Sequence, residues 1–75
     1  MPINIVAFGQ LAEITGSDFE IEAADTEELM QLLREKFTAL KEMKYAIAVN
    51  KKIVTKNTSL HNADMVALMP PFSGG

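Results

Sequence analysis

The segment Met65-Val66-Ala67-Leu68-Met69-Pro70-Pro71-Phe72-Ser73-Gly74-Gly75 decides how the rest of the chain is interpreted. Its first five residues predict a strand that is apolar on both faces and runs directly into two prolines, which fix φ and favour an extended path. The two glycines that follow have no side chains and a very broad backbone freedom. Residues 70–75 therefore read as a short arm, although a Gly-Gly end alone is also typical of a frayed terminus or an expression scar.

Upstream, four segments have the composition of strands. Ile3–Phe8 is rich in β-branched residues and carries apolar groups on both faces. Asp18–Ala23 alternates cleanly between acidic and apolar residues, which predicts a half-buried antiparallel strand near an edge of the sheet. Tyr45–Asn50 predicts another strand, and a turn then leads into the short segment Ile53–Thr55. An irregular polar stretch, residues 56–64, follows these four strands and leads to Met65.

One substantial helix is expected between the second and third strands. Asp25 or Thr26 caps its start, and Glu27 and Glu28 lie in its first turn, where the helix dipole favours acidic groups. An apolar stripe of helical period then follows, which predicts a helix that packs on one face of a sheet. Its members are Leu29, Leu32, Leu33, Phe37 and Leu40. Residues 10–14 could add about one further helical turn.

The order strand, strand, helix, strand, short strand, strand predicts an α+β fold of the β-grasp type. In this arrangement one main helix packs on one face of a mixed sheet, and the first and last strands lie side by side and parallel in its middle. We expect residues 1–69 to form this domain. One helix covers only one face, so apolar side chains of the other face should form an exposed patch that binds a partner. The candidates are Val6, Phe8, Val66 and Leu68.

Composition narrows the classes of function. The 75 residues suffice for one domain, and the lack of cysteine excludes a disulfide framework or a thiolate zinc site. The net charge of -3 argues against a nucleic-acid ligand. The seven acids of residues 1–28 are expected to form a solvated face, and they could also steer a basic protein partner. No membrane-spanning run and no basic leader are present, so we expect a cytoplasmic protein without a membrane partner.

The chain lacks the parts of a catalytic site. Its one histidine, His61, falls in a polar loop and is expected to be solvated. Gly9 and Gly16 have neither the spacing nor the lysine of a phosphate-binding loop, and no cluster of metal ligands occurs. We therefore expect no bound cofactor. If this protein takes part in covalent chemistry, the reactive group must be the C-terminal carboxylate of Gly75.

Several segments match a known pattern over nearly the whole chain. They are Phe8-Gly9-Gln10-Leu11 through Gly16, Ala48-Val49-Asn50, Leu60, Ala63-Asp64, and Val66 through the Pro-Pro-Phe-Ser-Gly-Gly end. Together with the size and the order of elements, they resemble the ubiquitin-like sulfur carriers and, more narrowly, the small subunits of molybdopterin synthase. Two positions depart from the pattern: Ala12 replaces a basic residue in the turn after the first strand, and Ala63 replaces a glycine.

The resemblance implies a carrier, that is, a non-catalytic subunit of a sulfurtransferase. An ATP-dependent adenylyltransferase similar to the ubiquitin-activating enzymes would adenylate Gly75, and a sulfur donor would convert it to a thiocarboxylate. The arm would then enter the large catalytic subunit, in a heterotetramer, and pass sulfur to a cyclic pterin phosphate of the molybdenum cofactor pathway. The partner-binding residues would be Phe8, Val66, Leu68, Pro70, Pro71, Phe72, Ser73 and Gly74.

Two alternatives remain open from the sequence. A carrier of the same class could deliver sulfur to the thiamine thiazole, to a thiolated tRNA or to a tungsten cofactor. The protein could also be a β-grasp binding module whose tail is only structural.

Overall fold

The computed structural model describes residues 2–70 of the chain. Its elements are β1 (Pro2–Ala7), α1 (Gln10–Thr15), β2 (Asp18–Glu22), α2 (Thr26–Lys36), the 3-10 helix η1 (Thr38–Glu42), β3 (Ala46–Val49), β4 (Lys52–Val54) and β5 (Met65–Met69).

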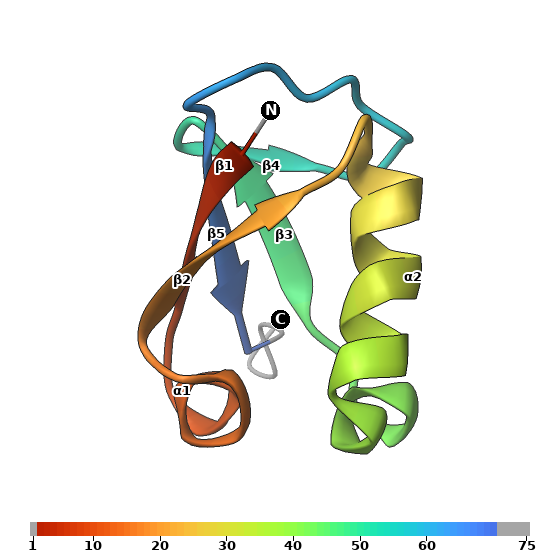
Figure 1. Cartoon of the computed structure of the whole chain (residues 1–75). Coiled ribbons are helices and arrows are strands. Elements are labelled where there is room, and N and C mark those ends of the chain that lie inside the picture. The colour runs from red at the N-terminus through yellow and green to blue at the C-terminus, as the bar shows by residue number, and fades with distance from the viewer. Residues whose placement is uncertain (1, 71–75) are drawn as a thin grey trace.

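The five strands form one mixed sheet in the order β2-β1-β5-β3-β4 (Figure 1). β1 and β5 are parallel, whereas the pairs β1–β2, β3–β5 and β3–β4 are antiparallel. The first and last strands thus lie side by side in the interior of the sheet, and β2 is an antiparallel edge strand. Both predictions are confirmed, and so is the α+β, β-grasp class.

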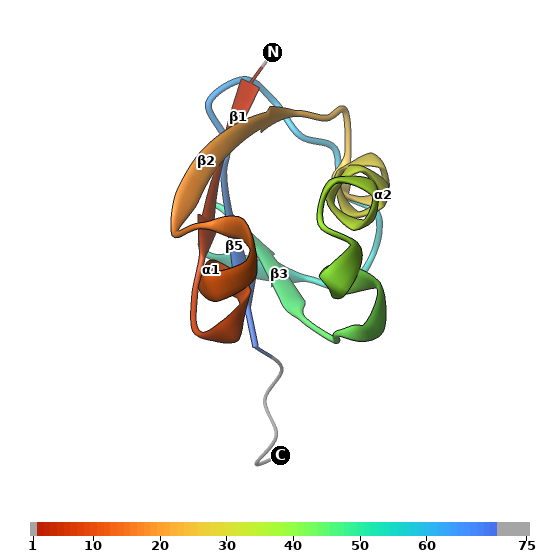
Figure 2. The ribbon, with the colours of Figure 1, turned by 60° about the horizontal axis from the view of Figure 1, so that its bottom comes forward.

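The main helix α2 lies across one side of the sheet (Figure 2). Asp25 caps it, because its carboxylate accepts a hydrogen bond of 2.8 Å from the backbone N–H of Glu28. Glu28 in turn accepts one of 2.7 Å from the N–H of Ala24, so the chain entering the helix is held from both directions. Leu29 and Leu33 are the residues of the predicted stripe that α2 itself buries fully.

The helix ends earlier than the stripe predicts. Phe37 leaves the helix with an extended backbone (φ -125°, ψ 90°), and Leu40 reaches the core from η1 instead. Phe37 in this position packs edge-to-face on Phe19 of β2, with ring centroids 5.9 Å apart. The stripe is confirmed for Leu29, Leu33 and Leu40, which tertiary packing divides between α2 and η1. Leu32, however, lies outside the core cluster, and Met30 packs against that cluster instead.

The core lies between α2 and the face of the sheet that α2 covers. Its fully buried large side chains are Ile3, Ile5, Leu11, Leu29, Leu33, Leu40, Val66 and Leu68. The loop between β4 and β5 closes one end: Leu60 is buried, and its N–H donates to the carbonyl of Ala24 at 2.9 Å. Among the described residues, no helix is both long and apolar enough to cross a membrane.

Candidate functional site: the open sheet face and the end of β5

β5 determines which side chains reach the open face of the sheet. Its parallel register places Val66 level with Ile5 and Leu68 level with Ala7, all of them on the side that α2 covers. Val66 and Leu68 are 0% exposed, so the prediction that they belong to an exposed patch is wrong. The patch was assigned to the wrong parity of β5: Val6 lies level with Ala67.

The registers define the open face row by row. One row crosses all five strands and reads Asp18, Val6, Ala67, Ala48 and Ile53. Two alanines at its centre leave the middle of this face low, while three large apolar side chains stand around it. These are Phe8, 49% exposed, Ile53, 56% exposed, and Met65, 45% exposed. We call these three residues the apolar rim.

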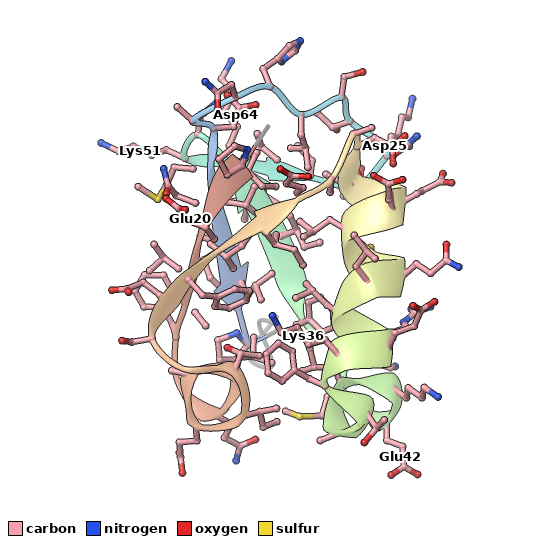
Figure 3. The ribbon with its side chains drawn as sticks, in the orientation of Figure 1. Glu20, Asp25, Lys36, Glu42, Lys51 and Asp64 are labelled. Atoms are coloured by element: carbon pink, nitrogen blue, oxygen red, sulfur yellow. The ribbon has the colours of Figure 1, made fainter. Side chains whose placement is uncertain are left out.

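Phe8 was predicted to be exposed, and its exposure is confirmed. Ile53 and Met65 were not predicted. The signal that could have found Ile53 is its place opposite Ala48 across a two-residue hairpin turn, which fixes its side of the sheet. For Met65 the signal is the alternation of β5 once Val66 is known to be buried. Figure 3 shows charged Glu20 and Lys51 directed away from α2, beside this face.

A polar network fixes the start of β5. Asn50 donates from its side-chain amide to Asp64 at 3.1 Å and accepts at 3.0 Å from the N–H of Met65. Asp64 also accepts from the N–H of His61 at 2.8 Å. The family resemblance singled out Asn50 and Asp64 from the sequence; the structure shows that they join the β3–β4 hairpin to β5.

His61 is solvated, as expected, with its side chain 79% exposed. The sequence did not indicate that its Nδ1 lies 3.7 Å from a carboxylate oxygen of Asp64. Both groups belong to a surface turn rather than a pocket with a nucleophile. Within residues 2–70, no three His, Asp or Glu side chains gather closely enough to hold a metal ion.

The end of β5 leads into the arm. The N–H of Phe8 donates to the carbonyl of Leu68 at 3.0 Å. This hydrogen bond continues the β1–β5 pairing almost to the end of β5, two residues before Pro70. Pro70 is exposed and lies beside α1, since it shares a hollow with Gln10 and Leu11. Figure 1 shows β5 running toward the end of the molecule that holds α1. The remaining predicted site residues lie outside the described part of the chain. They are Pro71, Phe72, Ser73, Gly74 and Gly75.

Comparison with known proteins was made on sequence and on structure. The sequence model of the ThiS family matches residues 5–75. A molybdopterin synthase sulfur carrier subunit from Haemophilus influenzae is 29% identical, over 97% of this chain and 99% of that protein. Subunit 1 in the complex of subunits 1 and 2 of the molybdopterin-converting factor from Helicobacter pylori is 37% identical and superposes with a TM-score of 0.77, over the full length of both chains.

Two further solved structures share the fold. A putative molybdopterin converting factor subunit 1 from Pyrococcus furiosus has a TM-score of 0.88 at 22% identity, over 95% of this chain and 98% of that one. SAMP1 from Haloferax volcanii has a TM-score of 0.81 at 21% identity over the full length of both chains. The family match covers nearly all of the chain, and the 37% identical relative covers all of it. The chain therefore belongs to the ThiS family and, within it, to the sulfur carriers of the molybdopterin synthase small-subunit kind.

Proposed function

We propose that the carboxylate of Gly75 carries the sulfur that this family delivers to molybdopterin. The observation that carries the proposal is the full-length match, at 37% identity, to a subunit 1 solved in complex with its subunit 2. The corresponding partner of this chain is the large catalytic subunit of molybdopterin synthase, and both proteins would work in the cytoplasm, as a heterotetramer.

The chemistry needs an activating enzyme because a carboxylate is a poor electrophile. Attack of the Gly75 carboxylate on the α-phosphorus of ATP forms an acyl adenylate and releases pyrophosphate. Sulfide-level sulfur from a donor then attacks the carbonyl carbon, AMP leaves, and a thiocarboxylate remains. Glycine suits both steps, since no Cβ hinders the approach to the carbonyl. We expect the partners to supply the general acid–base groups.

Docking follows from the open face. The apolar rim (Phe8, Ile53 and Met65) offers exposed apolar side chains that lose contact with water when a partner covers this face. Pro70 and Pro71 restrict the arm before it binds, which lowers the entropy lost when residues 72–75 enter the channel of the large subunit. Phe72 sits at the mouth of that channel, and Ser73 and Gly74 continue into it and lead to Gly75.

The intact mass of the protein tests the carrier role. The protein ending at Gly75 is incubated with the adenylyltransferase, ATP and a sulfide source. We expect a gain equal to the exchange of one oxygen for sulfur, and no gain for a variant lacking Gly75 or carrying an extra residue after it. An unchanged mass with an enzyme that thiolates another carrier would reduce the arm to a structural tail.

The acceptor is tested separately. Purified thiocarboxylate protein is mixed with the large synthase subunit and the cyclic pterin phosphate, and the dithiolene product and the loss of sulfur are followed together. Transfer to the pterin supports the molybdopterin pathway. A stable thiocarboxylate that neither binds the large subunit nor loses sulfur to it would instead favour delivery to thiamine, tRNA or a tungsten cofactor.

A further inference from the structure

Gly9 has an unusual backbone at the point where β1 turns into α1. Its φ of 59° and ψ of -136° belong to a region that side-chain-bearing residues rarely adopt. The turn is held by its neighbours: Leu11 donates to the carbonyl of Phe8 at 3.2 Å and Ala12 to that of Gly9 at 3.1 Å. The backbone conformation of the β1–α1 turn is therefore sufficient by itself to favour glycine at position 9.

A second constraint acts at the same residue. A Cβ placed on Gly9 would lie 3.0 Å from Cγ of Pro70 and 3.8 Å from its Cδ. The shorter distance is tighter than nine in ten of the contacts that real Cβ atoms make. Only a residue without a side chain lets the ring of Pro70 lie against the turn at this distance.

The surroundings of Pro70 complete a seat for its ring. Two residues earlier, the carbonyl of Leu68 accepts from the N–H of Phe8 at 3.0 Å, which ties β5 to the same turn. Pro70 also lines a hollow of about 240 Å³ together with Gln10, Leu11, Met43 and Lys44. The first residue of the arm is thus located by the β1–α1 turn and by residues that follow η1.

We propose that Gly9 is a positioning residue for the sulfur-carrying arm. By admitting the ring of Pro70, it sets the place and direction from which residues 71–75 start. This inference rests on the proposed carrier function for its consequence in sulfur transfer, but the seat itself is a property of the free protein. A misplaced start reduces the fraction of arms aimed at the channel of the large subunit without changing the reacting group.

Gly16 provides a matched control. It also has a positive φ, of 93°, but a Cβ built on it meets no atom within 4 Å. Gly9→Ala and Gly16→Ala therefore both place an alanine in a strained backbone region, and only the first pushes on Pro70. Pro70→Ala removes the Cγ that Gly9→Ala would strike, so the double variant Gly9→Ala/Pro70→Ala tests whether that contact is the cause.

The first readout is functional. Single-turnover sulfur transfer from thiocarboxylate protein is measured against the concentration of the large subunit. For Gly9→Ala we expect the half-saturating concentration to rise about tenfold, while the maximal rate changes less than about twofold. An effect of about tenfold is smaller than the roughly hundredfold loss of rate that a misplacement of about 1 Å can cause. Gly16→Ala should match the wild-type protein in both. The effects of Gly9→Ala and Pro70→Ala should not add, since both empty one seat.

The second readout needs no sulfur chemistry. In the free protein, a nuclear Overhauser effect between the Hα protons of Gly9 and the ring protons of Pro70 should be present, and it should be kept in Gly16→Ala. If Gly9→Ala does not fold, Pro70→Ala carries the kinetic readout, and the effect in the wild-type protein carries the second. Failure of the wild-type protein to accept sulfur would overturn the proposed function while this effect still reports the seat.

Three results would overturn the inference itself. One is an absent Gly9–Pro70 effect in the wild-type protein. Another is a Gly9→Ala variant whose transfer kinetics equal those of Gly16→Ala. The third is full additivity of Gly9→Ala and Pro70→Ala, which would mean that each acts through a separate cause.

Discussion

At the scale of single residues, Asp64 joins β1, the turn that contains His61 and the β3–β4 hairpin. The backbone N–H of His61 and then the side-chain amide of Asn50 donate to its carboxylate, and these hydrogen bonds hold the pKa of Asp64 below its ordinary value. Its backbone carbonyl also accepts from Asn4 of β1 at 2.9 Å. The alignment of β5 with β1 and with the β3–β4 hairpin therefore begins at one residue, through its backbone carbonyl toward β1 and its carboxylate toward the hairpin.

The lowered pKa of Asp64 predicts a pH dependence of stability. A carboxyl with a pKa lowered by folding stabilises the native state above its unfolded pKa of about 3.9 and loses that contribution as pH falls through the lower folded pKa. The stability difference between the wild-type protein and Asp64→Asn should hence be largest at neutral pH and shrink below about pH 4. Urea unfolding followed by circular dichroism at several pH values measures it.

Glu42→Gln is the control for Asp64→Asn, because Glu42 is an exposed carboxylate on η1. It should change the free energy of unfolding by less than about 0.5 kcal/mol at each pH. A stability difference for Asp64→Asn that stays constant from pH 7 to pH 3 would contradict the account of its pKa.

At the scale of elements, the start of α2 combines capping with anchoring of the next loop. Thr26 is a buried polar residue, and its hydroxyl accepts from the N–H of Thr58 at 2.9 Å. The side chain of Asn57 accepts from the N–H of Glu27 at 3.0 Å. The start of α2 thus holds the loop between β4 and β5. Because this loop leads into β5, the stability of the helix start also affects the strand that leads to the arm.

The cap of α2 gives a prediction about this element. Asp25→Ala removes the acceptor for the N–H of Glu28 and should lower the free energy of unfolding by about 1 kcal/mol. Asp25→Asn keeps a side-chain oxygen at the same place and should recover most of that loss. Denaturation midpoints of both variants decide the matter, and equal losses would assign the effect to the charge instead of the hydrogen bond.

The elements also show where prediction from sequence succeeds and where it stops. The strands, the cap of α2 and the parallel β1–β5 pair follow from periodicity and order, which are local or topological signals. The sidedness of β5 does not, because Met65, Ala67 and Met69 are as apolar as Val66 and Leu68. Only the register with β1 decides between the two sets, and register is a property of paired strands.

The candidate site was less predictable than the fold for a related reason. The position and approximate length of the arm were readable, but the seat of Pro70 depends on a positive φ at Gly9 and on a contact between residues 61 positions apart. Ile53 fell in a strand too short to show alternation. Such features arise when distant segments meet, and one sequence carries no direct record of them.

For the molecule as a whole, the two faces of the sheet have separate tasks. The face under α2 holds the core, and the open face carries the apolar rim. The domain is small, so its net stability is a narrow margin that one large core cavity can remove. Substitutions of core residues on the covered face should therefore lower the stability of the domain, whereas substitutions on the open face should weaken binding of the partner.

Leu68→Ala and Ile53→Ser test this separation. The first empties a fully buried site and should cost about 2–5 kcal/mol of stability. The second should leave the unfolding free energy within about 0.5 kcal/mol and weaken binding of the large subunit. Circular dichroism suits the unfolding measurements, since the chain has no tryptophan. A Leu68→Ala protein as stable as the wild type would contradict the assignment of β5.

Among residues 2–70, β5 is the only strand that links the pair β1–β2 to the pair β3–β4. β1 pairs with β2 and β3 with β4, and both pairs meet only through β5. Proteolysis before Met65 would therefore take Val66 and Leu68 out of the core and leave the two strand pairs unconnected. Because the stability margin of so small a domain is narrow, we expect a copy that loses its arm together with this strand to lose the fold as well.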